Sequence, residues 1–405
     1  MEKEFIKNTE RSVTLNVSAG NIDSFRQIEK TTGTVRVYDK GCIGVAGCLG
    51  EPDEAELIDR AKEALAFGIP YPERLDGPLE REEIYDEEIL PAAEFLPTMQ
   101  AFLDRLGALC PRFAFSNKIS ITYQEAEYQN SKGRKLKSAG RKIDIGLIAQ
   151  NRGSGNLFDT AFGWSGNRFD AEKLLAEFKR EYDAFYVPAD IEPGRYPVVM
   201  DALTMFSCFF NHFVGDLYAA GASLLSGRLG EKVFSEKLTA SDDRTPQTAD
   251  GVSFCDAEGC IAPDYRPTLI EKGVLKGLVT TKKTAEAYGL PNLGNAQSTY
   301  DGVPDLGFSK LYLEATAKSL RELVPGKSVL VVIAAGGDTT PDGHYASPVQ
   351  MAYLMENGEL VGRLPAVSIS GSFFDLLGKN YIGTVHDEPL EGAILSAFEM
   401  DVEKA

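Results

Sequence analysis

The order of apolar and polar residues in the first seventy positions predicts short strands followed by one helix. Residues 12–18 (SVTLNVS) and 33–38 (GTVRVY) alternate with period two, as strands with one buried face do. Residues 39–41 (DKG) give a turn signal, and the small, glycine-rich residues 42–48 predict a further strand. A helix follows, because Asp53 can cap it and an apolar stripe recurs at helical spacing at Leu57, Ile58, Ala61 and Leu65. Strands with a covering helix predict a small α+β layer.

The middle of the chain alternates between helical and strand patterns. Residues 69–92 are acidic and spaced by prolines, which predicts a linker or a strap over the surface. Apolar residues recur at helical spacing in 92–109 and 170–184. Between these helices, residues 118–150 predict antiparallel strands with a turn at 130–133 (NSKG).

From about residue 195 the pattern is mostly that of β-structure, with two or three helices. The Asn357-Gly358 pair predicts a type I′ hairpin turn, because it tolerates the two positive φ angles required. The sequence therefore predicts an α+β protein with an N-terminal α/β-layered region and a larger β-rich C-terminal domain. The expected parts are an N-terminal subdomain (1–70), a middle subdomain that starts with the acidic linker (71–192) and the C-terminal domain (193–405).

Charge and composition narrow the classes of function. A net charge of −18 disfavours nucleic acid as a partner, and the basic cluster 132–142 is best explained as a solvated strand-and-turn face. No segment approaches the ~18–20 apolar residues of a membrane span, and the first residues have no apolar core of a signal peptide. Six cysteines without C-x-x-C spacing predict reduced thiols and a cytoplasmic location.

The candidate metal site lies in residues 211–231, which follow a strongly apolar run. Asn211, His212 and Asp216 are expected on one helix, where Asn211 and Asp216 would face a common point only if the helix bends. Asn is a poor zinc ligand, and a lone histidine is more often hydrogen-bonded and half-buried than a ligand. His344 and His386 are expected in surface loops, and a composite site from all three histidines stays open as an alternative.

Other chemistry has weaker signals. Ser207 and Cys208 lie in an apolar run, where a cysteine usually behaves as a small hydrophobe. Acidic residues near turns could bind a hard cation, but solvated turn carboxylates are the more common explanation. These acids are Asp242, Asp243, Asp256 and Glu258.

Several motifs make the chain similar to a known family over nearly its full length. The N-terminal and middle motifs are GTVRVYDKGCIGVAGC (33–48) and NSKG (130–133). The C-terminal motifs are more specific: PGRYPVVMD (193–201), SGRLGE (226–231), FCDAEG (254–259), LIEKGVL (269–275) and SISGS (368–372). The chain resembles the TldD/PmbA family, also called the modulator of DNA gyrase family. The resemblance implies a heterodimeric cytoplasmic metallopeptidase that degrades unfolded peptides or matures modified ones.

The same resemblance implies that this chain is not the zinc-binding subunit. The catalytic TldD-type subunit carries His-Glu-x-x-x-His and a later cysteine as zinc ligand. Here Asn211 and Asp216 stand at the two histidine positions, His212 stands at the glutamate position, and no cysteine follows Cys260. This pattern resembles the PmbA (TldE) type, so no catalytic, cofactor-binding or metal-binding residue is expected in this chain.

The expected zinc would then lie in a TldD-like partner subunit, with a homodimer possible for the isolated chain. One alternative is a divergent stand-alone hydrolase that uses His212 and Asp216, together with His344 or His386. The other is a protein-binding modulator, for example of DNA gyrase, without peptidase chemistry.

Overall fold

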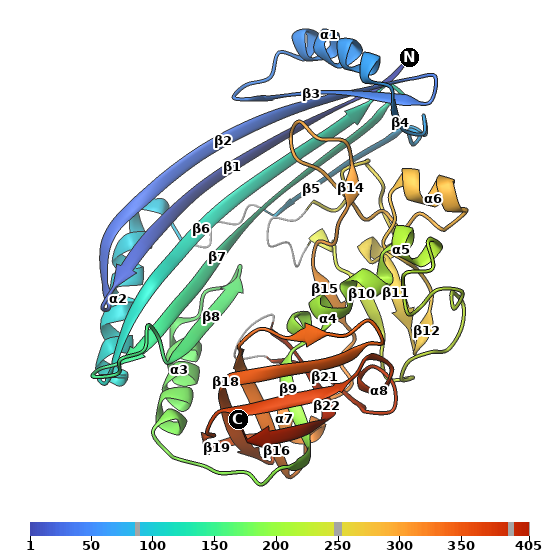
Figure 1. Cartoon of the computed structure of the whole chain (residues 1–405). Helices are drawn as coiled ribbons and strands as arrows, with labels where there is room; N and C mark the ends of the chain where they lie inside the picture. Colours follow the sequence, from blue (N-terminus) through green and yellow to red (C-terminus); the bar gives the residue numbers. More distant parts are fainter. Residues whose placement is uncertain (86–89, 247–252, 388–392, 405) are drawn as a thin grey trace.

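A computed structural model describes residues 1–85, 90–246, 253–387 and 393–404. Within these residues, a long N-terminal sheet arches over a β-rich C-terminal part, and the helices lie in separate segments of the chain (Figure 1). The predicted α+β class is therefore confirmed.

The N-terminal sheet has the strand order β4-β3-β2-β1-β6-β7-β5, and β8 pairs with β7. Its strands are β1 (Glu2–Ser18), β2 (Asn21–Asp39), β3 (Cys42–Leu49), β4 (Ile69–Pro70), β5 (Leu79–Tyr85), β6 (Phe113–Asn130), β7 (Arg134–Asn151) and β8 (Thr160–Gly166). The prediction of several short strands before residue 48 is wrong, because β1 and β2 form one long hairpin. A tight turn at Ala19 (φ 48°) and Gly20 (φ 89°) joins them, and the polar residues of both strands pair across the exposed part of the arch.

Three helices and one 3-10 turn pack on this sheet: α1 (Glu54–Ala64), η1 (Leu65–Phe67), α2 (Ala92–Leu109) and α3 (Ala171–Phe185). The Asp53 side chain caps α1 by accepting the backbone N–H groups of the first turn, and Leu57 and Ala61 pack against β2 and β3. Helices α2 and α3 cover the other end of the arch, around a core that includes Phe102, Phe113 and Phe178. The helices predicted from apolar spacing are confirmed.

The C-terminal sheet has the order β16-β9-β22-β20-β18-β17, with β19 on β18 and β21 on β22. A further pairing of β16 with β18 closes five of these strands into a ring. The strands are β9 (Gly194–Asp201), β16 (Lys327–Ala334), β17 (Asp338–Thr339), β18 (His344–Glu356), β19 (Glu359–Arg363), β20 (Val367–Ser372), β21 (Tyr381–Asp387) and β22 (Ala393–Lys404). Asn357 (φ 54°) and Gly358 (φ 80°) form the predicted hairpin turn between β18 and β19.

Short elements connect β9 to β16. The helical ones are α4 (Ala202–Phe209), η2 (Phe210–Phe213), α5 (Gly215–Ala219), η4 (Pro263–Tyr265), α6 (Lys282–Tyr288) and α7 (Leu320–Leu323), and α8 (Phe373–Leu376) follows β20. A small sheet contains β10 (Ala240–Asp242), β11 (Thr268–Glu271), β12 (Val274–Leu275) and β15 (Leu311–Leu313). The pair β13 (Ala296–Gln297) and β14 (Asp305–Leu306) lies beside the arch.

The two expected N-terminal subdomains, 1–70 and 71–192, contribute strands to one sheet, since β1 pairs with β6 along its length. The acidic segment 69–92 is not only a strap: β5 is an edge strand that pairs in parallel with β7. Residues 86–89 of this segment lie outside the described residues. Helix α3 joins the two halves of the chain, because its Glu181 carbonyl accepts the Tyr353 hydroxyl of β18 at 2.9 Å.

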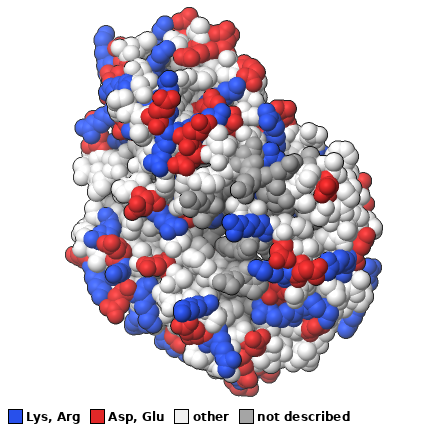
Figure 2. Space-filling view, turned by 180° about the vertical axis from the view of Figure 1, so that it is seen from behind, with Lys and Arg blue, Asp and Glu red and all other residues white. Residues whose placement is uncertain are grey.

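The surface carries both signs of charge, and acidic and basic side chains alternate over the face in Figure 2. In the basic cluster 132–142, Lys137 pairs with Glu127 at 2.9 Å and Lys142 with Asp144 at 3.3 Å. Arg134 of the same cluster is 14% exposed and donates to the Gly259 carbonyl at 2.7 Å, so only part of the cluster is a solvated face. Among the described helices, none combines the length and the apolar character needed to cross a membrane.

Candidate functional site

The segment with Asn211, His212 and Asp216 is broken into short elements, so the prediction of one helix is wrong. Helix α4 passes into the 3-10 turn η2, which carries Asn211 and His212, and α5 carries Asp216. Between η2 and α5 the backbone of Val214 is extended (φ −74°, ψ 123°).

Close packing explains the break. The Gly215 N–H donates to the Val279 carbonyl at 3.0 Å, and a Cβ on Gly215 would lie only 2.9 Å from Thr280 Cγ2. The chain is therefore held against residues 279–280, and this bond replaces the one that a continuous helix would use.

One ring nitrogen of His212 has a structural partner. Its Nδ1 accepts the Leu224 N–H at 3.3 Å, and its ring packs 5.1 Å from the Phe373 ring. Burial lowers the pKa of His212, so the ring is neutral at neutral pH. Asn211 is exposed. His212 is thus a half-buried, hydrogen-bonded side chain, in agreement with the explanation favoured for a lone histidine.

The remaining candidate ligands are distributed over other elements. Asp216 accepts the Thr284 hydroxyl at 3.1 Å. The prediction of loops for the other two histidines is wrong, because His344 begins β18 and His386 lies on β21. His386 Nε2 lies 2.7 Å from the Leu313 carbonyl oxygen.

His212, Asp216 and His344 do not meet. Among the described residues, the group of three potential ligand atoms within 4.8 Å of one another contains no histidine. The composite site of three histidines is likewise not assembled among them. Ser207 and Cys208 each donate to the Thr204 carbonyl, and burial raises the pKa of Cys208, so neither is an activated nucleophile.

An apolar cavity of about 640 Å³ borders α4 and η2. Phe206, Phe210 and Phe308 are among its walls, with Asp201 and Lys310 as charged members. Such a lining can hold an apolar side chain. Two of its polar side chains are engaged with α4, since Ser207 donates to the Thr204 carbonyl and Asp201 accepts the Thr204 N–H.

The four acids expected in solvated turns are buried instead, with relative exposures of 0–4%: Asp242, Asp243, Asp256 and Glu258. The explanation as solvated turn carboxylates is therefore wrong. Each accepts hydrogen bonds that replace water; Asp242, for example, accepts the N–H groups of Ser309 and Lys310, both at 2.9 Å.

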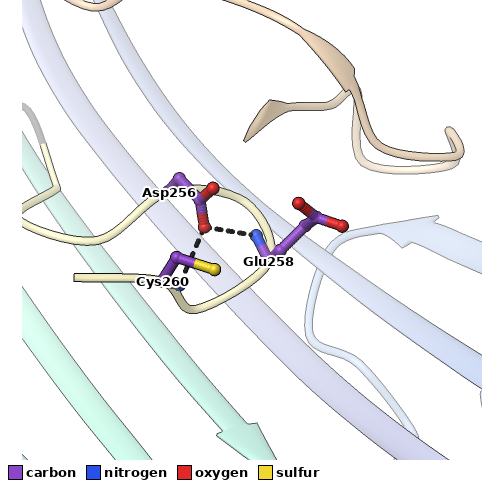
Figure 3. A group of neighbouring side chains, drawn as sticks. All are labelled: Asp256, Glu258 and Cys260. Atoms are coloured by element: carbon purple, nitrogen blue, oxygen red, sulfur yellow. Dashed lines mark hydrogen bonds between the residues drawn. The ribbon is translucent and has the colours of Figure 1, made fainter. Parts of the chain in front are cut away.

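Asp256 organises a tight loop with Glu258 and Cys260, drawn in Figure 3. One carboxylate oxygen of Asp256 accepts the N–H groups of Glu258 (2.9 Å) and Cys260 (2.8 Å), and the other accepts the Ala296 N–H (3.1 Å). These three donors use the oxygens that a cation would need.

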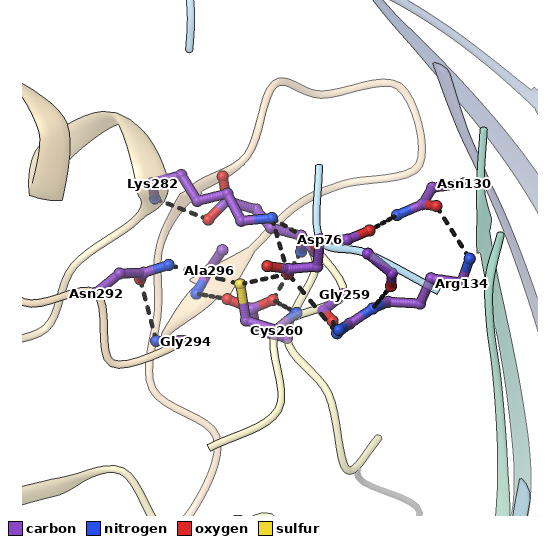
Figure 4. A network of polar contacts seen from close by, with 12 residues as sticks. Asp76, Asn130, Arg134, Gly259, Cys260, Lys282, Asn292, Gly294 and Ala296 are labelled. Atoms are coloured by element: carbon purple, nitrogen blue, oxygen red, sulfur yellow. Dashed lines mark hydrogen bonds and ion pairs between the residues drawn. The ribbon is translucent and has the colours of Figure 1, made fainter. Parts of the chain in front are cut away.

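Lys282 supplies the positive charge at this loop (Figure 4). Its ammonium nitrogen lies 3.1 Å from both Asp76 Oδ2 and the Glu258 carbonyl oxygen. Burial opposes its charge, but Cys260, Asp76 and Glu258 together hold the pKa of Lys282 above its usual range. An ammonium group thus already lies beside the carboxylates, and the group does not fit a metal ion.

Sequence reasoning missed Lys282, Asp76 and Tyr71, which donates its hydroxyl to Glu258 at 2.7 Å. Tyr71 lies 187 positions from Glu258, and Asp76 lies 206 positions from Lys282, so no local pattern marks these pairs.

Comparisons with known proteins agree with this architecture. The structure of TldE from Thermococcus kodakarensis superposes with a TM-score of 0.81 at 19% identity, covering 100% of this chain and 97% of that one. Residues 193–395 match the model of the PmbA/TldA metallopeptidase C-terminal domain.

Relatives whose names state an activity are more similar in sequence than the TldE structure is. A metalloprotease of Archaeoglobus fulgidus is 26% identical over 398 residues, which cover 92% of this chain and 89% of that protein. A zinc metalloprotease TldD homolog of Saccharolobus solfataricus is 25% identical over 267 residues, or 62% of this chain and 59% of the other.

The matched domain places the chain in a metallopeptidase family. The chain belongs to this family, the PmbA/TldD family. The residues that the sequence resemblance puts at the zinc positions suit zinc poorly: Asn211 offers a weak amide ligand, and Asp216 already accepts the Thr284 hydroxyl. His212 stands at the position of the base, where its Nδ1 is engaged with backbone.

Proposed function

We propose that this chain is the non-catalytic, PmbA/TldE-like subunit of a metallopeptidase complex with a TldD-like partner. The observation that carries the proposal is the state of Asn211, His212 and Asp216. Their residue types suit zinc poorly, and one side-chain atom each of His212 (Nδ1) and Asp216 (Oδ2) accepts a hydrogen bond within the fold. Zinc is then expected only in the partner.

The relatives support the same assignment. One structure with the same fold carries the name TldE, and sequence relatives carry the name metalloprotease. The complex would act in the cytoplasm on unfolded or modified peptides. This chain would contribute walls and backbone edges that accept extended peptides of many sequences.

The test is to purify the chain alone and together with its TldD-like partner. Metal content is measured by mass spectrometry, and hydrolysis of an unfolded peptide is followed with and without a chelator. We expect no stoichiometric zinc and no hydrolysis for the chain alone, and chelator-sensitive hydrolysis for the pair. Stoichiometric zinc together with hydrolysis by the chain alone would overturn the proposal.

The His212→Ala variant separates the proposal from a stand-alone hydrolase. In the complex, this variant should retain hydrolysis, because His212 has no chemical role. If its loss abolishes hydrolysis while zinc in the partner stays bound, the hydrolase alternative gains support. Failure to bind any TldD-like partner would favour the binding-modulator alternative.

A further inference from the structure

The contact between the arched sheet and the C-terminal part is made by buried polar groups. From β2, Arg36 Nη1 donates to the Ala257 carbonyl at 2.6 Å. Tyr71, just after β4, donates its hydroxyl to Glu258 Oε1 at 2.7 Å. The Lys282 backbone N–H donates to Glu258 Oε2 at 2.9 Å. Glu258 therefore joins one residue of the N-terminal half to the start of α6.

The charges buried at this contact do not balance. Glu4, Asp242, Asp256 and Glu258 have exposures of 1%, 0%, 3% and 2%. The buried cations beside them are Arg36 (0%), Arg244 (5%) and Lys282 (8%), and Arg244 lies between Asp242, at 3.4 Å, and Asp256. We name these seven residues the interdomain charge cluster. With every carboxylate ionised, it would hold four negative and three positive charges. Buried charges without compensation are costly, so one carboxylate is favoured in its neutral form.

The groups around Glu258 add no free cation. Lys282 is shared with the partly exposed Asp76, at 3.1 Å. The charged or titratable groups of the neighbouring elements are Glu4 on β1, Arg36 and Tyr38 on β2, Tyr71 and Asp76 after β4, Tyr128 on β6, Arg134 on β7, Arg244 after β10, Asp256 and Cys260 on the same loop, and Lys282 on α6.

The hydrogen bonds indicate which carboxylate holds the proton. Asp256 accepts hydrogen bonds from three backbone N–H groups, and such a group can only donate, so these bonds favour the ionised carboxylate. Glu4 accepts the Arg36 guanidinium at 2.7 Å. Glu258 has one backbone donor and the Tyr71 hydroxyl, whose oxygen can accept a hydrogen bond from protonated Glu258 once the hydroxyl rotates. Burial and the charge of Asp256 raise the pKa of Glu258 to about 7.

We propose that Glu258 is a proton-operated switch of the contact between the N-terminal sheet and the C-terminal part. Protonated Glu258 is neutral, donates to Tyr71 and keeps the contact closed. When the proton leaves, the interdomain charge cluster holds an uncompensated negative charge, and the contact opens to admit water.

The switch adjoins a large cavity, which gives it a route to affect binding. A cavity of about 810 Å³ is lined by Asp76 and Arg134 from the N-terminal half and by Cys260 and Asn292 from the C-terminal part. Asp76 is also the ion-pair partner of Lys282, so opening the contact moves a wall of this cavity.

The test uses hydrogen–deuterium exchange of the full chain at pH 6 and pH 8, on either side of the Glu258 pKa of about 7. Rates are corrected for the intrinsic pH dependence of exchange and compared for peptides that cover 254–260 and 280–284. The ionised fraction rises from about one tenth to about nine tenths between these pH values, so opening should increase about tenfold. The Glu258→Gln variant, which imitates the neutral acid, should show no such rise.

The matched control is Glu80→Gln, since Glu80 is exposed on the neighbouring strand β5. It should exchange as the wild type does. Equal corrected rates at both pH values in the wild type, or an unchanged rise in Glu258→Gln, would overturn the proposal.

A second measurement does not depend on a folded variant. Infrared spectra of the wild-type chain should show the carbonyl band of a buried protonated carboxylic acid at pH 6, which disappears by pH 8. A spectrum without this band at pH 6 would equally overturn the proposal.

Discussion

Replacement of Arg36 by methionine tests the buried ion pair at the centre of the N-terminal sheet. Arg36 and Glu4 are 0% and 1% exposed, with 2.7 Å between Nη1 and Oε1. Methionine keeps a similar volume but leaves the Glu4 carboxylate with only the hydroxyls of Tyr38 (2.9 Å) and Tyr128 (2.8 Å). It also removes the bond to the Ala257 carbonyl. Breaking a buried pair from one side typically costs about 3–5 kcal/mol of unfolding free energy, and we expect a loss in this range.

The assay is urea unfolding, followed by circular dichroism and by the fluorescence of Trp164, so that coincidence of the two transitions tests cooperativity. The double variant Glu4→Gln/Arg36→Met should lose less than Arg36→Met alone, by at least about 1 kcal/mol, because it removes the unpaired charge. The control is Arg11→Met, which breaks an exposed pair with Glu29 and should leave the transition unchanged. A loss below about 1 kcal/mol for Arg36→Met would refute the reasoning.

Three further predictions concern pH, thiols and glycines. Glu258 has a pKa of 4.5 when unperturbed and about 7 in the fold, so unfolding releases a proton between these values. The free energy of unfolding should therefore fall as pH rises from about 4.5 to about 7, by about 3 kcal/mol, since each pKa unit corresponds to about 1.36 kcal/mol. Calorimetry of the wild type and of Glu258→Gln measures this difference. Burial raises the pKa of Cys110 to about 12 and of Cys255 to about 11, so mass spectrometry should find both unlabelled by iodoacetamide at pH 8 in the native chain and labelled in urea. Gly273→Ala should destabilise more than Gly326→Ala: both have positive φ, but a Cβ at Gly273 would lie 2.4 Å from a backbone oxygen, whereas Gly326 faces open space. Equal unfolding midpoints for the two glycine variants would contradict this steric argument.

The sequence predicted elements well where burial follows a simple period. Helix α1 and the Asn357-Gly358 turn were found because capping, apolar spacing and turn chemistry are local. The sequence pattern did not predict the length of β1 and β2. Polar residues such as those at 23–32 break the alternation, because both faces of this part of the hairpin are largely exposed and its stability comes from cross-strand pairing.

The buried acids show a second limit of local reasoning. Asp256 lies in a turn, as its sequence context suggests, but its burial depends on a donor at Ala296. Glu258 depends on Tyr71, which lies 187 positions away. These partners are adjacent only in the folded chain, where the arched sheet contacts the C-terminal part. Composition and periodicity therefore predict, wrongly, that these carboxylates are solvent-exposed.

The segment of Asn211 and His212 shows why the fold does not depend on the zinc chemistry that we propose this chain lacks. Its position is fixed by apolar packing, since Phe209 and Phe213 are buried beside Phe373 in the C-terminal core. None of these contacts requires a metal, and His212 itself contributes through the Phe373 ring and a backbone hydrogen bond. Replacement of ligand residues therefore need not disturb the fold. A subunit whose zinc positions have changed can keep the surfaces and backbone edges by which the family recognises peptides and partners, and on these surfaces the proposed function depends.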